Sequence, residues 1–200
     1  TRIAKLAFTG STPVGKHILH AAADNLVPAT VELGGKSPNI FFADVMDQDD
    51  AFLDKALEGL TMFALNQGEI CTCPSRILVQ ESIYERFIEK AIARVQKISA
   101  GHPLDKTTMV GAQASQQQLD KILGYLDIGR DEGAQVLIGG GRNTPAEGLD
   151  KGFYIKPTML LGNNKMRVFQ EEIFGPVASV VTFRDEEEAI AIANDTFFGL

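Results

Sequence analysis

The sequence predicts an α/β fold in which a largely parallel sheet is flanked by helices. Short apolar runs of strand length recur along the chain, and amphipathic helical patterns lie between them almost throughout. Glycines, prolines and helix-capping residues separate the two kinds of segment. Because two parallel strands need a long crossover connection, usually a helix, this alternation favours parallel pairing over hairpins.

The apolar runs place the strands, and the start and stop signals place the helices. The expected strands cover residues 3–8, 29–33, 39–43, 76–80, 135–138, 153–161 and 177–183. The expected helices run from Pro13 to Asn25, over 49–65, from 82 to 98, from 115 to 133, and over 185–194. The passage 139–151 is rich in glycine, proline and asparagine, which is typical of a surface loop.

Helix starts carry recognisable polar residues. Residues 49–65 give the clearest early helix, because apolar residues recur there at helical spacing. A serine followed three residues later by Glu or Gln is a capping-box pattern, and it occurs twice. These two patterns make Ser82 and Ser115 the expected N-caps of the helices 82–98 and 115–133. Ser11 or Thr12 is the expected cap of the first helix, and Asp185 that of the last.

Composition narrows the class of function. The 200 residues are 44% hydrophobic and 22% charged, which is average for a globular protein, and the formal net charge is −7. An acidic chain repels nucleic acid and anionic lipid, so neither is an expected partner. No apolar run approaches membrane-spanning length, and no signal peptide opens the chain. The two cysteines flank Thr72 and cannot form a secreted-type disulfide framework, which predicts a reducing, cytoplasmic setting.

The two ends of the sequence suggest that it continues beyond them. It begins at Thr1 without an initiator methionine and runs at once into an apolar stretch. It stops at Leu200, directly after a helical pattern and before any closing element. We therefore expect an internal piece of a longer protein.

Cys71 is the first candidate for chemistry. It lies in the turn-rich passage 66–74, between a strong helix pattern and a strand. A thiol in an exposed polar loop can reach the nucleophilic thiolate state. A small, buried and inert cysteine is the commoner fate of a free thiol, and the residues alone favour it. A zinc site built on Cys71 and Cys73 is not expected, because no histidine or second cysteine pair lies nearby.

Glu32 is the second candidate. It follows the apolar residues of a strand and directly precedes Leu33, Gly34 and Gly35. A carboxylate there is either exposed at the end of the strand or partly buried with a raised pKa, and the second state suits a general base. The residues alone favour the first.

Two further segments suit a nucleotide. Residues 10–15 lie between a strand and a helix, where free N–H groups and the helix dipole can hold a phosphate, although a plain helix-start turn fits as well. Residues 170–176 place two acids before a Gly-Pro turn, and such an acid can hold ribose hydroxyls or simply be solvated. The three histidines, His17, His20 and His102, have no metal-site spacing and are interpreted as structural or surface residues.

Taken in order, these segments resemble the NAD(P)-dependent aldehyde dehydrogenase superfamily. Residues 8–12 look like its phosphate loop on the nicotinamide side, and 32–39 match its glutamate signature. Residues 66–71 match its cysteine signature, and 171–177 its ribose-contacting segment. The resemblance extends over essentially all 200 residues. Four motifs in the right order are far more specific than any one of them.

The resemblance implies a fold with two parts. Residues 1–33 would be the end of a Rossmann-like NAD(P)-binding domain, and 34–200 an aldehyde dehydrogenase-like catalytic domain truncated at its C-terminal end. The family's first half, with its oxyanion-hole asparagine and most of its dinucleotide-binding sheet, is not in these 200 residues. We therefore expect little or no dehydrogenase activity from the 200 residues alone.

The resemblance also implies a role for each motif residue. Cys71 would attack the aldehyde to form a thiohemiacetal, with its own N–H helping to hold the oxyanion. Glu32 would activate the water that hydrolyses the resulting thioester, and would also help to deprotonate Cys71. Glu172 would hold the nicotinamide ribose, with Phe174 packed beside the ring. Gly10 and Ser11 would lie against the diphosphate. The other residues of the expected coenzyme site are Thr12, Gly15 and Leu33.

Within the superfamily, the acidic stretch 43–50 and the passage 69–76 look most like bacterial acetaldehyde dehydrogenases, which oxidise short aliphatic aldehydes. The implied coenzyme is NAD, with NADP as the alternative, and the implied assembly is a homodimer or homotetramer. Two other functions stay open. A CoA-acylating relative would generally lack a glutamate at position 32, and a catalytically silent protein of the same fold would not need Cys71.

Overall fold

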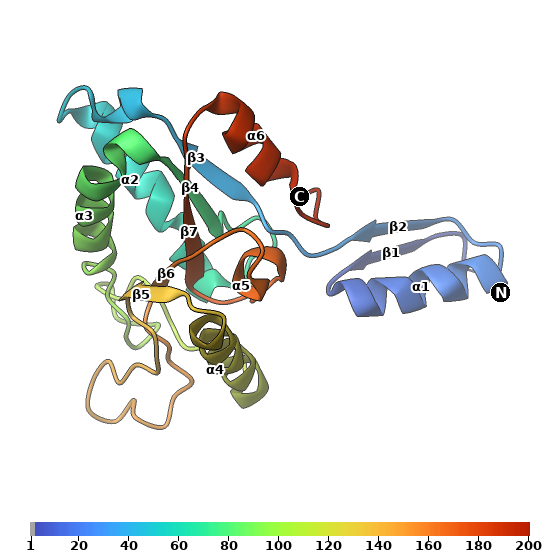
Figure 1. Ribbon diagram of the computed structural model, residues 1–200. Helices are drawn as coiled ribbons and strands as arrows, with labels where there is room; N and C mark the ends of the chain where they lie inside the picture. The colour runs from blue at the N-terminus through green and yellow to red at the C-terminus, as the bar shows by residue number, and fades with distance from the viewer. Residues whose placement is uncertain (1–2) are drawn as a thin grey trace.

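The computed structural model describes residues 3–200, which form two separate sheets (Figure 1). The first is a small β-α-β unit at the N-terminal end. The second is a five-stranded sheet with helices on both faces, and a connection between β2 and β3 joins the two. The α/β class with a largely parallel sheet is therefore confirmed. The expected domain division between residues 33 and 34 stays a prediction, and it falls between the two sheets.

The N-terminal unit consists of β1 (Leu6–Thr9), α1 (Thr12–Asp24) and β2 (Ala29–Glu32). The two strands pair in parallel, with Leu6 opposite Ala29. Ser11 occupies the N-cap of α1 and a proline lies in the first turn, as expected, but the Ser11 side chain makes no capping hydrogen bond. Gly15 lets α1 lie close to the Leu33 side chain, because a Cβ at position 15 would lie only 2.4 Å from Leu33 Cδ2.

The larger sheet has the strand order β3-β4-β7-β6-β5. Its strands are β3 (Pro38–Phe41), β4 (Arg76–Gln80), β5 (Gln135–Ile138), β6 (Thr158–Leu161) and β7 (Val177–Phe183). Only the β5–β6 pair is antiparallel, and it carries an irregularity between Val136 and Ile138. The central strands are buried on both faces, which explains why they read as continuous apolar runs rather than as alternating ones.

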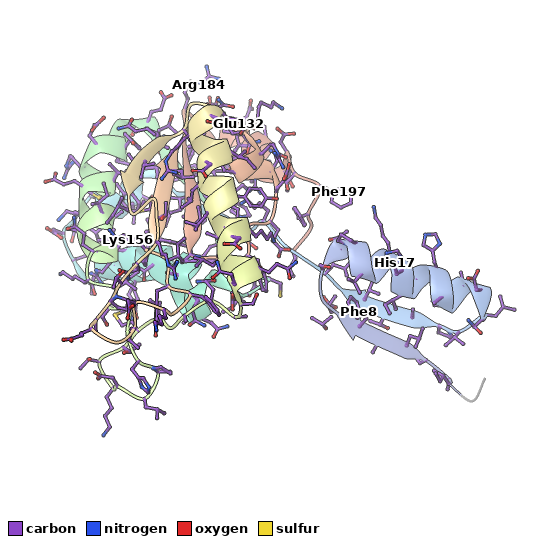
Figure 2. The ribbon with its side chains drawn as sticks, turned by 90° about the horizontal axis from the view of Figure 1, so that it is seen from below. Phe8, His17, Glu132, Lys156, Arg184 and Phe197 are labelled. Atoms are coloured by element: carbon purple, nitrogen blue, oxygen red, sulfur yellow. The ribbon has the colours of Figure 1, made fainter. Side chains whose placement is uncertain are left out.

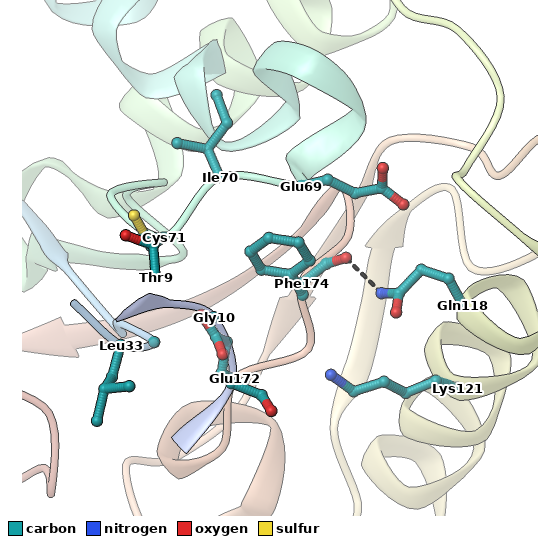
Figure 3. A pocket seen from close by; sticks show the side chains of 12 residues that line it. Thr9, Gly10, Leu33, Glu69, Ile70, Cys71, Gln118, Lys121, Glu172 and Phe174 are labelled. Carbon is teal, nitrogen blue, oxygen red and sulfur yellow. Dashed lines mark hydrogen bonds between the residues drawn. The ribbon is translucent and has the colours of Figure 1, made fainter. Parts of the chain in front are cut away.

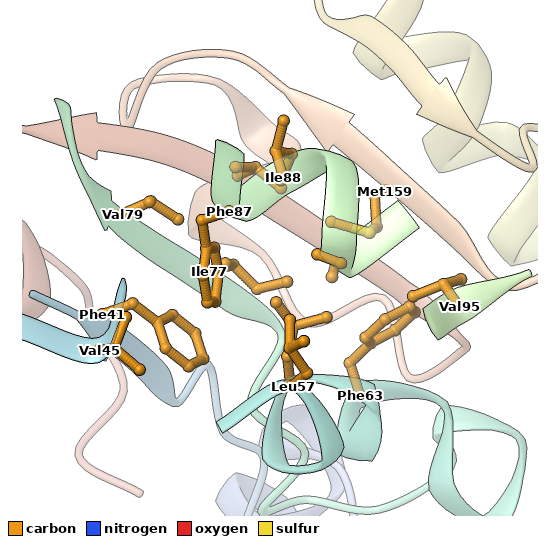
Figure 4. Packing of buried hydrophobic residues seen from close by; sticks show 14 of the residues in the cluster. Phe41, Val45, Leu57, Phe63, Ile77, Val79, Phe87, Ile88, Val95 and Met159 are labelled. Carbon is orange, nitrogen blue, oxygen red and sulfur yellow. The ribbon is translucent and has the colours of Figure 1, made fainter. Parts of the chain in front are cut away.

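Two hydrophobic clusters cover the two faces of this sheet. The first lies between the sheet and helices α2 (Ala51–Thr61) and α3 (Tyr84–Val95) (Figure 4). The second lies under α4 (Gln116–Asp131), α5 (Arg167–Gln170) and α6 (Glu186–Asn194). Strand β4 alternates between them, with Ile77 and Val79 in the first and Leu78 in the second. In residues 3–200, no helix is both long and apolar enough to cross a membrane.

Of the other three expected N-caps, two are confirmed and one is wrong. Ser115 accepts a hydrogen bond from Gln118 N, and Asp185 accepts one from Glu188 N. Ser82 does not cap α3. A 3₁₀ turn, Glu81–Ile83, precedes that helix, and its N-cap is Ile83 without a side-chain bond. The capping-box pattern therefore lies inside a turn rather than before the helix.

Two other elements have boundaries that differ from the prediction. The expected strand 153–161 pairs only from Thr158 onward, apart from one isolated bridge at Ile155, because Pro157 has no N–H for the ladder. The expected helix 49–65 ends at Thr61. A 3₁₀ segment, Met62–Gly68, follows it and is kinked, because Leu65, Asn66 and Gln67 do not have helical backbone angles. A third 3₁₀ turn, Ala43–Met46, follows β3.

Arg76 is fully buried at the start of β4 and joins three segments. Its Nε donates to Lys36 O at 2.8 Å, just before β3. Its Nη1 donates to Ile192 O at 2.8 Å and its Nη2 to Ala193 O at 2.7 Å, in the last turn of α6. A cation at a helix C-terminus is favourable, and here it donates to two carbonyls of the last turn.

Replacing this guanidinium tests its contribution. We expect Arg76→Met to lower the free energy of unfolding by about 3 kcal/mol, because one buried and two half-buried carbonyls lose a charged donor. Chemical denaturation of the full-length protein that contains residues 1–200 measures the effect. Arg86→Met is the matched control, since Arg86 is exposed. Equal stabilities of the two variants would show that the buried contacts contribute nothing.

Candidate active site

One cavity of about 480 Å³ lies where the N-terminal unit meets the larger domain. Four segments distant in sequence line it: the β1–α1 turn, the residues after β2, the loop before β4, and the segment between α5 and β7, with α4 closing one side. Figure 3 shows Phe174 near its centre, with Cys71 on one side and Gln118 and Lys121 on the other. The lining residues are Thr9, Gly10, Ser11, Leu33, Gly34, Glu69, Ile70, Cys71, Gln118, Lys121, Glu172 and Phe174.

Most of the residues singled out from the sequence meet in this cavity. Cys71 and Glu172 line it together with Gly10, Ser11, Leu33 and Phe174. Three others are not among its lining residues. Thr12 and Gly15 lie in the first turns of α1, and Glu32 is the last residue of β2 with an exposed side chain. Of the two settings considered for Glu32, the structure has the exposed one at the end of the strand.

The two cysteines differ in environment. Cys71 is a free, half-buried thiol on the cavity wall. Cys73 is buried, lies 3.7 Å from Met62 O, and has its pKa raised to about 11 by burial. A high pKa keeps Cys73 as an unreactive thiol. In residues 3–200, no group of three or more His, Cys, Asp or Glu side chains could hold a metal ion.

Two glycines let neighbouring backbones reach the loop that carries Cys71. A Cβ on Gly35 would lie 2.3 Å from Cys71 O. On the other side, a Cβ on Gly68 would lie 2.1 Å from Gly175 C, and Gly68 has φ +72°. No side chain other than hydrogen fits at such distances. The Cys71 loop is thus held between the segment after β2 and the segment before β7.

The loop begins with an unusual backbone turn. Asn66, Gln67 and Gly68 have φ values of +48°, +59° and +72°. Glycine and asparagine tolerate this left-handed region, but glutamine pays about 1 kcal/mol or more for it. Phe174, which also lines the cavity, is left-handed too, with φ +59°. Non-glycine residues in this region concentrate at functional sites.

The neighbouring acids Glu171 and Glu172 have different partners. Glu172 lines the cavity, and Gly35 N donates to its Oε1 at 3.1 Å. Glu171 faces the other way, where it binds both Arg167, through Nε at 2.8 Å, and the Tyr125 hydroxyl at 2.8 Å. The hydrogen bond from Arg167 lowers the pKa of Glu171. Glu171 therefore anchors the segment while Glu172 stays free to face the cavity.

Helix α4 supplies residues that the sequence reasoning missed. Gln118 donates from Nε2 to Phe174 O at 2.6 Å, and Lys121 brings an ammonium group to the same wall. Both lie on one face of α4, three residues apart. The spacing is visible in the sequence, but nothing there shows that this face meets Phe174.

Lys36 is buried near the cavity, with 1% of its surface exposed. Its Nζ has no hydrogen-bond partner among the described residues. Burial, and then the positive charge of Arg76, lowers its pKa to about 7, while Glu172 and Glu171 act in the opposite sense. A buried amine without a partner is costly to the folded state when it is charged.

The comparisons with known proteins agree with this arrangement. The sequence profile described as "Aldehyde dehydrogenase family" matches residues 1–200. The chain belongs to the aldehyde dehydrogenase family. It is 68% identical over 199 residues to an aldehyde dehydrogenase of Deinococcus radiodurans and 66% identical over 199 residues to acetaldehyde dehydrogenase 2 of Cupriavidus necator. It is also 65% identical over 200 residues to a long-chain-aldehyde dehydrogenase of an Acinetobacter species.

Each match covers 100% of this chain but only 38–39% of the relative. The fold of this family member is likewise found in solved structures. A betaine aldehyde dehydrogenase from Staphylococcus aureus, crystallised in complex with NAD⁺, superimposes with a TM-score of 0.91 at 39% identity. That match covers 99% of this chain and 38% of the other.

Adding one methyl group at Gly35 tests the close contact between this residue and the Cys71 loop. We expect Gly35→Ala to lower the free energy of unfolding by about 1–3 kcal/mol and to slow alkylation of Cys71, because the new Cβ displaces the loop backbone. Gly59→Ala is the control. A Cβ there meets nothing within 4 Å, and alanine should stabilise α2 by about 0.5–1 kcal/mol. Denaturation and peptide mapping after iodoacetamide treatment measure both effects.

The buried amine predicts a pH dependence of stability. The unfolded chain protonates Lys36 below its ordinary pKa of 10.5, whereas the folded chain does so only below about 7. Between these values the unfolded state binds more protons, so stability should rise as pH rises from 7 toward 10.5. Lys36→Met should remove this rise and stabilise the protein near pH 7. Denaturation across that range checks it, and a variant with the wild-type pH slope would contradict it.

Proposed function

We propose that the protein oxidises an aldehyde to the carboxylic acid with NAD as coenzyme, using Cys71 as the nucleophile. One observation carries the proposal most strongly. Cys71 shares a single cavity with a helix-start turn, a glutamate and an aromatic ring that come from distant parts of the chain. Family membership supports the same reaction, and the NAD⁺ complex of the Staphylococcus aureus relative supports the coenzyme.

The residues of the cavity suit a nicotinamide dinucleotide. Gly10 and Ser11 stand at the start of α1, where the helix dipole favours a diphosphate, and the Ser11 hydroxyl is not used for capping. The Gly10 N–H is already bound to Glu32 O at 3.0 Å. Glu172 accepts one bond from Gly35 and has lone pairs left for ribose hydroxyls. The Phe174 ring offers an apolar wall and Lys121 a positive charge. When bound there, the coenzyme would accept a hydride.

Cys71 performs the covalent step. Its thiolate forms a bond to the aldehyde carbon, and the carbonyl oxygen takes up the electron pair. Loss of a hydride, which the bound coenzyme would accept, would let the oxyanion re-form its carbonyl and would leave a thioester on Cys71. The half-buried position on the cavity wall keeps the thiol accessible to a small substrate.

Glu32 takes a proton from the water that attacks the thioester, and the C–S bond then breaks to release the acid and the Cys71 thiolate. Glu32 ends β2 with an exposed side chain directly before the cavity residues Leu33 and Gly34, so this role requires the carboxylate to turn toward the cavity. A glutamate here favours water over coenzyme A as the group that resolves the thioester.

We propose a short aliphatic aldehyde such as acetaldehyde as the substrate. The resemblance of residues 43–50 and 69–76 to acetaldehyde dehydrogenases supports it, as does 66% identity to a protein of that name. A long-chain relative at 65% identity makes chain length the first specificity to measure. A catalytically silent protein of the same fold is the alternative function, and an accessible Cys71 argues against it.

Substituting the nucleophile tests the reaction. We expect Cys71→Ser to lower kcat by about a thousandfold or more, because a serine hydroxyl is a far weaker nucleophile than a thiolate. The assay follows the absorbance of reduced nicotinamide with acetaldehyde, in the full-length protein that contains residues 1–200, with NAD and NADP run side by side.

Cys73→Ala is the control for this experiment and should keep most of the activity, because Cys73 is buried away from the cavity wall. Unchanged turnover in Cys71→Ser, or no turnover with any aldehyde in the parent protein, would favour the silent alternative.

A further inference from the structure

The turn at the start of the Cys71 loop holds a residue that does not suit its backbone. Gln67 lies between Asn66 and Gly68 in the left-handed region, with φ +59°. Asparagine and glycine adopt this conformation readily, and glutamine does not. A glycine at position 67 would relieve the backbone, so the presence of glutamine points to a role for its side chain.

Both the side chain and the backbone of Gln67 have partners in one distant segment. Gly111 N donates to Gln67 Oε1 at 3.1 Å, and Gln113 Nε2 donates to Gln67 O at 3.3 Å. A third bond continues the contact two residues later, where Ala114 N donates to Glu69 Oε1 at 3.0 Å. The segment 111–114 therefore binds the loop along its length.

That segment is itself firmly held. Gln113 is 4% exposed, and its backbone N donates to Phe153 O at 2.9 Å. Immediately after it, Ser115 caps α4, the helix that lines the cavity with Gln118 and Lys121. The loop is thus fastened to a rigid element on the same wall of the site.

The opposite side of the turn meets backbone rather than side chains. Gly68 lies against Gly175, and Gly35 lies against the carbonyl of Cys71. Between these two close approaches, the hydrogen bonds of Gln67 join the left-handed turn to the segment 111–114. Four residues after Gln67 comes the thiol on the cavity wall.

We propose that Gln67 is a positioning residue for Cys71, whose amide oxygen, bound by Gly111 N–H, holds the left-handed turn that directs the thiol into the cavity. The inference rests on the proposed role of Cys71 and adds a residue to it. Gln67 does not touch the substrate, because it is not among the residues that line the cavity.

Three variants separate the hydrogen bond from the strain. Gln67→Met keeps the length of the side chain and removes the acceptor. Gln67→Gly removes the acceptor and also relieves the left-handed backbone, so it should melt at or above the temperature of the parent protein. Gln67→Glu keeps an acceptor oxygen for Gly111 N–H. Gln117→Met is the matched control, since Gln117 is exposed on the first turn of α4.

The readouts are kcat, KM for NAD, the rate at which iodoacetamide alkylates Cys71, and the melting temperature, all in the full-length protein that contains residues 1–200. We expect the Gly and Met variants to lose kcat by roughly tenfold or more, with alkylation of Cys71 slowed in parallel and KM for NAD nearly unchanged. The Glu variant should recover most of the lost kcat, and the control should match the parent.

Full kcat and a normal alkylation rate in folded Gln67→Gly would overturn the inference. Failure of both acceptor-free variants to fold would overturn it too, because Gln67 would then be a stability element. Cys71→Ser keeps the two proposals apart. If that variant stays active, the proposed function fails; if it is inactive while the Gln67 variants are normal, only the positioning role fails.

Discussion

The buried guanidinium of Arg76 is the contact on which the arrangement of the larger domain depends. It binds the carbonyl of Lys36 on one side and the last carbonyls of α6 on the other, from the first residue of β4. The residue before it, Ser75, accepts a bond from Ser179 N in β7. The segment that follows β2, the Cys71 loop and the C-terminal helix are thereby fixed to the same strand end. An uncharged side chain could not satisfy three carbonyls from two segments at once.

The site itself depends on the absence of side chains as much as on their presence. Gly35 and Gly68 allow the Cys71 loop to lie directly against two other backbones, while Gly34 lies against the carboxylate of Glu172. These close main-chain contacts therefore limit where the loop that carries the thiol can lie. The two neighbouring acids differ in role. Glu171 binds Arg167, whereas Glu172 lines the cavity.

Local signals predicted the elements well, and contacts between distant segments were the part that a single sequence could not supply. Strands 76–80, 135–138 and 177–183 begin and end as predicted, and Ser115 caps its helix. The prediction that Ser82 caps α3 was wrong, because a capping-box pattern does not show whether a 3₁₀ turn lies between the serine and the helix.

At the site, the motifs named Cys71 and Glu172, but no periodicity reveals that α4 brings Lys121 to them. The left-handed conformation of Gln67 could not be predicted either, since its hydrogen-bond partners Gly111 and Gln113 lie more than forty residues away. The exposed side chain of Glu32 is another feature of three-dimensional surroundings rather than of local pattern.

The pairing of β4 with β7 has a consequence for how the protein is made. Arg76 of β4 pairs with Ser179 of β7, so β4 has its second neighbour only after about a hundred further residues have been synthesised. At ordinary translation rates that interval is on the order of ten seconds. Throughout it, Gly175 has not yet closed against the Cys71 loop, and the thiol is open to oxidants and electrophiles in its surroundings. The Cys71 thiol, which lies on the cavity wall in the finished fold, is thus least protected in the nascent chain.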